Sequence, residues 1–201
     1  MMQLFSANAS PFARKVRVVL YETGQVADVE LLSAEGSPMN SSRMPVAHNP
    51  LGKLPTLVRP DGPAIYDSRV ICQFLNARAK ADLYPQSHIW ETLTLEATGD
   101  GVMEAALLMV YEGRSRPENM QYAPWVEGQW GKVTSTLDAV NARWMSHLAG
   151  PVDAASIAMG CALGYLDFRL GVRDWRQGRD GLAAWYEGFS ARESMQATVP
   201  S

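Results

Sequence analysis

The chain has 201 residues, a formal charge of −3 and 47% hydrophobic residues, enough to fill one large core or two small ones. Its lysines and arginines are scattered rather than gathered in a stripe, which argues against nucleic acid as a partner. No apolar run is long enough for a membrane span, and no signal-peptide pattern opens the chain. We therefore expect a cytoplasmic protein with no membrane partner.

The cysteines and histidines do not suggest a metal site or a redox pair. Cys72 and Cys161 lie far apart within apolar helical patterns, which predicts two reduced core thiols. His48, His88 and His147 stand apart from one another and from carboxylates at ligand spacing. We expect no metal cofactor.

The first helix is predicted to begin at Ser10-Pro11. Residues 2–5 favour a short strand, and apolar residues then recur at helical spacing as far as Thr23. Serine is a favoured N-cap and proline a favoured first helical residue. At such an N-terminus, unpaired N–H groups and the helix dipole favour an anion and lower the pKa of a nearby thiol. The simpler interpretation, that Ser10 only caps the helix, stays open.

The rest of the first 80 residues predicts a small sheet with helices. Val29–Leu32 is expected to be a strand, and residues 33–49 a loop with at most one helical turn. Thr56–Val58 and Ala64–Tyr66 flank a turn-rich connector and predict an antiparallel hairpin, after which Ser68 is expected to cap a helix. The predicted order is β-α-β-loop-β-β-α.

After this sheet the pattern becomes helical. Residues 80–88 read as a linker, which separates an expected first domain, 1–79, from a second, 89–201. Four helices are expected in the second domain: Ile89 to about Gly113, Pro124 to about Leu148, Ala154–Leu170, and Gly181 to about Glu193.

Two dipeptides carry polar groups that suit a peptide-like ligand. Leu54-Pro55 stands before a strand, where a cis peptide would expose the backbone of Leu54, although spacing alone favours the commoner trans form. Asp67-Ser68 places a carboxylate and a hydroxyl at a second helix N-terminus, which suits an amino-acid head group. For Ser68 the plain capping role also stays open.

Three segments, Ser10–Val16, Asn49–Leu57 and Asp67–Ser68, together resemble the glutathione transferase superfamily, and the similarity extends over nearly the whole chain. The resemblance implies an α/β plus all-α protein: a thioredoxin-like N-terminal domain (βαβ-ββα) that binds glutathione, then an all-helical domain whose buried central helix begins at Asp153. The chain looks like a bacterial, cytosolic, serine-type member.

The resemblance also implies roles for the residues that match its motifs. Ser10 would donate a hydrogen bond to the glutathione sulfur, and Leu54 would pair its backbone with the cysteinyl part of the tripeptide, ahead of a cis Pro55. Asp67 and Ser68 would hold the γ-glutamyl end. Further glutathione contacts are expected from Phe12 and Lys53. Asp100 matches an acidic residue that, in many family dimers, reaches the γ-glutamyl amine of the glutathione bound to the other subunit.

The sequence departs from the family pattern in two places. The redox members of the family have a cysteine at the position of Ser10, and their dithiol members have a second cysteine at the position of Ala13. This chain has neither cysteine, so a mixed disulfide between the protein and its ligand at this site is excluded. The capping box of the helical domain is reversed, with Asp153 first and Ser156 third after it; we expect Asp153 still to cap the helix. The first helix has three basic residues, Arg14, Lys15 and Arg17, and we expect at least two of them to lie on its solvated face.

The predicted function is that of a glutathione transferase, a detoxification-type enzyme that activates the thiol of its co-substrate glutathione for attack on a small hydrophobic electrophile. Met103, Leu107 and Tyr111 are candidates for the electrophile pocket, although a stripe at that spacing is more often ordinary core. Two alternatives remain: a glutathione-dependent isomerase, and a non-catalytic carrier of glutathione or a hydrophobic ligand. A homodimer is implied by the family.

Overall fold

The computed structural model of the protein describes residues 1–201. It divides into two compact units, unit 1 being Met1–Gln86 with Glu193–Ser201, and unit 2 being Ser87–Arg192. The C-terminal segment thus packs with the first unit, whereas the sequence suggested one helical domain through residue 201.

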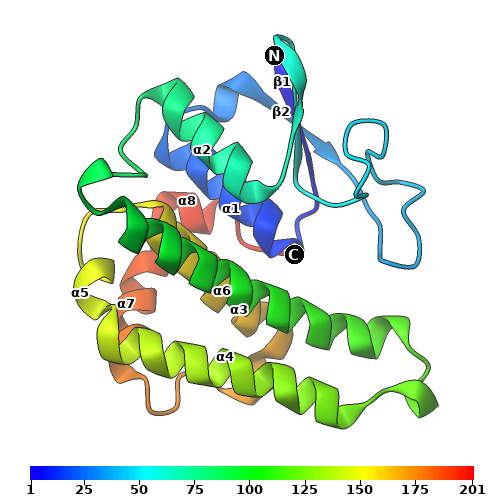
Figure 1. Cartoon of the computed structure of the whole chain (residues 1–201), viewed down its shortest axis with the longest axis vertical. Coiled ribbons are helices and arrows are strands. Elements are labelled where there is room, and N and C mark those ends of the chain that lie inside the picture. The colour runs from blue at the N-terminus through cyan, green and yellow to red at the C-terminus, as the bar shows by residue number, and fades with distance from the viewer. The chain divides into compact units, whose positions relative to one another are not determined.

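Unit 1 is a four-stranded mixed sheet with helices, as expected. Its elements are β1 (Met2–Ser6), α1 (Pro11–Glu22), β2 (Val29–Ser33), β3 (Thr56–Arg59), β4 (Gly62–Ile65), α2 (Ser68–Ala79), α8 (Glu193–Gln196) and a 3₁₀ turn at Val26–Asp28. The strand order is β2-β1-β3-β4, with β1 and β2 parallel and the other pairs antiparallel. Leu4 and Leu57 are paired across β1 and β3, and both are fully buried. The fold is thioredoxin-like (Figure 1).

One detail of unit 1 agrees with the sequence prediction and one differs from it. Residues 34–49 form the expected loop, with an isolated bridge between Ser37 and Asn40 and one turn of the helical type, in which the N–H of Asn49 donates to the carbonyl of Pro45 at 2.8 Å. The hairpin is tighter than expected, because Arg59 pairs with Gly62 and its Nε donates to the carbonyl of Pro63 at 3.0 Å. Proline is tolerated in β4 because this strand lies at the edge of the sheet.

Unit 2 is helical throughout. Its elements are α3 (Ile89–Ser115), α4 (Ala123–Arg143), α5 (Met145–Leu148), α6 (Ala154–Leu170), α7 (Asp180–Ser190), and 3₁₀ turns at Glu118–Met120 and Gly171–Arg173; a further turn, Gln86–His88, joins the two units. Helix α6 packs along α3, and its residues are buried from Ala154 to Leu166. Close approach requires a glycine here, since a Cβ on Gly99 would lie 2.9 Å from the backbone of Ala158.

The capping box of α6 forms in its reversed order, which confirms the expectation. Asp153 Oδ1 accepts the N–H of Ser156 at 2.9 Å, and Ser156 Oγ accepts the N–H of Asp153 at 2.9 Å. The second carboxylate oxygen accepts from Thr92 Oγ1 at 2.9 Å and lies 2.8 Å from Nε2 of His147. Asp153 therefore joins α6 to α3 and α5 as well as capping its helix.

Two predicted helices of the second half are interrupted. The helix expected over residues 124–148 breaks at Trp144 into α4 and α5, and the last one breaks between α7 and α8. Val140 and Leu148 are buried on either side of the first break, so the apolar spacing continues across it and does not report it. No helix combines the length and apolar character needed to cross a bilayer.

Candidate functional site

Ser10 occupies the N-cap of α1, as predicted. Its backbone is extended, with φ −82° and ψ 120°, and its Oγ accepts the N–H of Ala13 at 3.3 Å. The carbonyl of Ser10 accepts the N–H of Arg14 at 2.9 Å, which starts the helix. Because Oγ is the acceptor in the capping bond, the hydroxyl proton remains available to a ligand. Capping and ligand binding are therefore compatible roles for one side chain.

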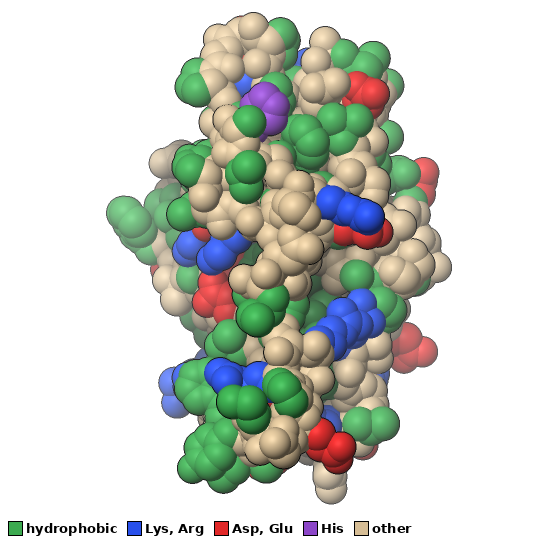
Figure 2. Space-filling model, turned by 90° about the vertical axis from the view of Figure 1, so that its right-hand side faces the viewer, with side chains coloured by type: hydrophobic (Ala, Val, Ile, Leu, Met, Phe, Trp, Pro, Cys, Tyr) green, Lys and Arg blue, Asp and Glu red, His purple; other side chains and the backbone are tan.

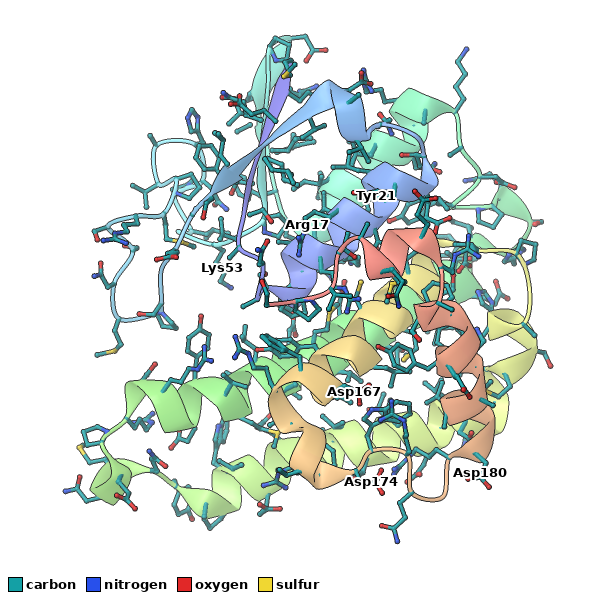
Figure 3. All side chains as sticks on the ribbon, turned by 180° about the vertical axis from the view of Figure 1, so that it is seen from behind. Arg17, Tyr21, Lys53, Asp167, Asp174 and Asp180 are labelled. Atoms are coloured by element: carbon teal, nitrogen blue, oxygen red, sulfur yellow. The ribbon has the colours of Figure 1, made fainter.

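The basic residues of α1 are buried, which corrects the expectation of a solvated face. Arg14, Lys15 and Arg17 are all at most 8% exposed. Arg14 donates to the carbonyl of Met195 at 3.0 Å, and Arg17 donates to Oδ1 of Asn8 at 3.2 Å. Figure 3 shows Arg17 on α1 with the C-terminal segment beside that helix. The C-terminal segment covers this face, so local spacing in α1 did not reveal the burial.

Asn49 organises the loop that leads into β3. This side chain is 1% exposed, and its amide donates to the carbonyl of Lys53 and to Oγ1 of Thr56, both at 3.1 Å. Its Oδ1 accepts the N–H of Leu51 at 3.1 Å. Sequence reasoning quoted Asn49 within a motif but gave it no role. The Asn-Pro-x-Gly pattern was the available signal, because asparagine side chains bind nearby backbone in turns.

The peptide between Leu54 and Pro55 is cis, as the family resemblance implied and spacing alone did not. Neither backbone polar group of Leu54 takes part in a hydrogen bond within the protein, and the residue is half-buried, whereas Pro55 is buried. Lys53 is exposed on the loop just before this peptide (Figure 3). An unpaired N–H and C=O at the end of a strand can bind the backbone of a peptide-like ligand.

The N-cap of α2 is Asp67, not Ser68 as predicted. Asp67 Oδ1 accepts the N–H of Arg69 at 3.0 Å, while Oδ2 lies 2.9 Å from Nη2 of Arg69. Ser68 is buried as the first helical residue, and its hydroxyl makes no hydrogen bond within the protein. The Tyr66–Asp67 peptide is also cis. Aspartate is as good a cap as serine, so the Asp-Ser pair alone did not fix which residue caps.

The electrostatics around Asp67 keep it ionised. Partial burial raises the pKa of this carboxyl, but the hydrogen bonds and charge of Arg69, together with the charge of Lys15, outweigh it and hold the pKa below its ordinary value. Lys15 belongs to α1, so the N-termini of both helices contribute to one charged region. Sequence reasoning missed this role for Lys15.

The predicted site residues of the helical unit differ in how far they are exposed. Asp100 is 4% exposed within α3, and its contact to glutathione of the other subunit stays a prediction, whereas Met103 is fully buried. Leu107 and Tyr111 are half-buried on the same helix, and Phe12 in unit 1 is also half-buried. No three His, Cys, Asp or Glu side chains are grouped to hold a metal ion, and neither Cys72 nor Cys161 forms a disulfide.

Comparison with known proteins decides the family. The models of the glutathione S-transferase N-terminal and C-terminal domains match residues 9–78 and 123–188. The chain is 31% identical to the uncharacterized GST-like protein YibF of Escherichia coli K12 over 99% of this chain and 98% of that protein. The chain belongs to the glutathione transferase superfamily.

Solved structures of the superfamily agree. A glutathione transferase family member from Pseudomonas fluorescens Pf-5, with bound glutathione, is 41% identical over the full length of both chains, with a TM-score of 0.97. A structure of a family member from the same organism with bound S-(propanoic acid)-glutathione has a TM-score of 0.93 at the same identity and coverage. The superfamily assignment and the two-part fold predicted from the sequence are thereby confirmed.

Proposed function

We propose that this protein is a glutathione transferase in which unit 1 binds glutathione and Ser10 activates its thiol. The thiolate sulfur attacks an electrophilic carbon of a small second substrate. A sulfur–carbon bond forms, and the displaced electron pair leaves with a leaving group or moves out of a carbon–carbon π bond. The glutathione bound to the Pseudomonas relative supports the choice of co-substrate.

The observation that carries the proposal is the state of the Ser10 hydroxyl, which accepts the capping bond from Ala13 and keeps its proton to donate. A free thiol with a pKa near 8.5 is only a few per cent ionised at neutral pH. Lowering that pKa by about two units requires roughly 2.7 kcal/mol of preferential stabilisation of the thiolate. One hydroxyl donor and a helix N-terminus are together of this size.

The rest of unit 1 supplies groups that match a tripeptide. The unpaired backbone of Leu54 suits the cysteinyl peptide, and the ionised carboxyl of Asp67 suits the γ-glutamyl ammonium. The hydroxyl of Ser68, at the start of α2, is available for the γ-glutamyl carboxylate. Phe12 and Lys53 are kept in the proposal as flanking contacts, because Phe12 is only half-buried two residues after Ser10 and Lys53 is exposed next to Leu54.

Three Ser10 variants test the activation role. Ser10→Gly removes the hydroxyl but costs the N-cap only a few tenths of a kcal/mol, Ser10→Ala removes both functions, and Ser10→Thr keeps both. Each variant is titrated with glutathione bound, and the thiolate is followed by its ultraviolet absorbance. We expect the apparent thiol pKa to rise by about one to two units in the Gly and Ala variants and to stay near wild type in the Thr variant. An unchanged titration in Ser10→Gly contradicts the role.

Binding and turnover are tested separately. Retention on immobilised glutathione with elution by free glutathione is expected if the site is correct. Formation of conjugates from a panel of electrophiles separates a transferase from a carrier, which binds without turnover, and from an isomerase, which returns glutathione unchanged. The proposed homodimer is tested by sedimentation of the intact chain.

A further inference from the structure

A tight turn connects β1 to the N-cap of α1. The N–H of Ser10 donates to the carbonyl of Ala7 at 3.0 Å, so Asn8 is one of the two central residues of this turn. Ser10 is only half inside the helix, because its carbonyl accepts a helical hydrogen bond while its own backbone is extended. The position of the Ser10 hydroxyl therefore depends on the turn as well as on α1.

Arg17 holds this turn from within α1. Its Nη1 donates to Oδ1 of Asn8 at 3.2 Å, and its Nη2 donates to the backbone carbonyl of Asn8 at 3.3 Å. Two donors of one planar guanidinium thus bind the side chain and the backbone of the same residue. Because Arg17 is 8% exposed, water competes little for these two bonds. We call this pair of residues the Arg17–Asn8 clamp.

The C-terminal segment, residues 193–201, keeps this side of α1 away from solvent. Arg14 lies three residues before Arg17, on the same face of the helix. It donates from Nη2 to the carbonyl of Met195 at 3.0 Å and from Nε to Oγ1 of Thr198 at 3.4 Å. Figure 3 shows the segment beside α1, where Arg17 is labelled. The turn, the helix and the C-terminal segment all belong to unit 1.

We propose that Arg17 is a positioning residue for Ser10: through Asn8 it fixes the turn, and thereby the direction in which the Ser10 hydroxyl donates. This inference rests on the proposed function, since it assigns how the activating hydroxyl is held. The capping bond from Ala13 is long, at 3.3 Å, so a shift of the turn also moves Oγ relative to a bound sulfur. A hydrogen-bond donor displaced by a fraction of an ångström loses much of its effect on a reacting atom.

A double-mutant cycle with Ser10 tests the proposal. The apparent thiol pKa of bound glutathione is measured for the intact wild type, Arg17→Gln, Arg17→Lys, Ser10→Gly and the double variant Ser10→Gly with Arg17→Gln. Lysine keeps the positive charge but not the two-donor fork, so it separates positioning from the field of a charge. Arg78→Gln is the control, because Arg78 also ties a helix of unit 1 to a turn, through Gln25 and Asp28, beyond the opposite end of α1.

We expect Arg17→Gln and Arg17→Lys each to raise the thiol pKa by about 0.5–1 unit, and Arg78→Gln to leave it unchanged. In the Ser10→Gly background, Arg17→Gln is expected to add less than about 0.3 unit, because the hydroxyl that it positions is gone. Equal thiol pKa values for the wild type and Arg17→Gln overturn the inference. A rise that persists in the Ser10→Gly background, or that is absent in Arg17→Lys, also overturns it, because Arg17 then acts through its charge.

Asn8→Ala keeps the test decisive if the variants of the buried Arg17 fail to fold. Asn8 is exposed, and alanine removes the Oδ1 acceptor while leaving the backbone carbonyl for Nη2. We expect an unfolding temperature close to that of the wild type and a thiol pKa raised by about 0.5 unit. A wild-type thiol pKa in Asn8→Ala overturns the inference and leaves the proposed function intact. A wild-type titration in Ser10→Gly, or a wild-type protein that does not bind glutathione, overturns the proposed function itself.

Discussion

Replacing Asn49 with alanine tests whether one buried side chain holds the loop that presents Leu54. The substitution removes three hydrogen bonds, to the carbonyl of Lys53, to Oγ1 of Thr56 and from the N–H of Leu51. Each bond of this kind contributes about 1 kcal/mol net, so the free energy of unfolding is expected to fall by about 3 kcal/mol. Thr56 Oγ1 still donates to Lys53, so the loop is loosened rather than lost.

The assay pairs urea denaturation with glutathione binding, and Asn40→Ala is the matched control. Asn40 is exposed and its side chain accepts one hydrogen bond, from the N–H of Ser42. Its loss is expected to cost less than about 1 kcal/mol, because water replaces the missing partner. We expect Asn49→Ala to weaken glutathione binding as well, since the unpaired backbone of Leu54 no longer has a fixed position. Equal stabilities of the two variants would refute this reasoning.

Three further predictions follow from the packing and the electrostatics. Asp153→Ala is expected to lower the free energy of unfolding by about 2–4 kcal/mol, because the helix cap and the contacts to α3 and α5 are lost together. Asp153→Asn retains the cap and is expected to cost less. Equal urea midpoints for the two variants would contradict this. Gly99→Ala is expected to destabilise the protein by about 1–3 kcal/mol, because the new Cβ would meet the α6 backbone. Gly101→Ala is expected to stabilise it by about 0.5–1 kcal/mol, because a Cβ there meets nothing and alanine favours the helix. Thermal unfolding that ranks the two variants the other way counts against the packing argument. The folded-state pKa of Asp67 is depressed, so the stability that its carboxylate contributes is present above the unfolded pKa of about 4 and is lost as the pH falls through the folded value. Asp67→Asn is therefore expected to lower the free energy of unfolding by under about 1 kcal/mol at pH 7, because solvent screens this half-exposed group, and by progressively less below about pH 4. A difference in unfolding free energy that does not change with pH would rule this out.

The sequence predicted the features of the fold that depend on near neighbours. The cap at Ser10, the capping box of Asp153 and the strand–helix order all follow from residues within four positions of one another. Local chemistry was insufficient where two good caps stand side by side, as at Asp67 and Ser68, since either residue satisfies the helix end. It was also insufficient at Trp144, because the buried face continues through the break.

The candidate site was predictable only in part, because several of its residues depend on distant segments. Arg14 looked like an exposed helical residue, yet it donates to the carbonyl of Met195 and to Oγ1 of Thr198. Lys15 lowers the pKa of Asp67 only because α1 packs against α2, which brings residues 52 positions apart into one charged region. No periodicity within one helix reports such partners. Figure 2 shows the corresponding surface pattern, with basic and acidic side chains in small separate groups and no continuous basic area on the face drawn.

The two interpretations of Ser10 that the sequence left open are consistent with each other in the structure. A serine N-cap needs only the lone pairs of its oxygen, whereas thiolate stabilisation needs only its proton. The capping bond from Ala13 also fixes the side-chain rotamer, so the donor is oriented before a ligand arrives and less entropy is lost on binding. Cysteine in this position would itself be the nucleophile, and glycine would keep the cap without a donor. Serine is thus a residue that stabilises the start of α1 and can still direct a proton toward a bound sulfur.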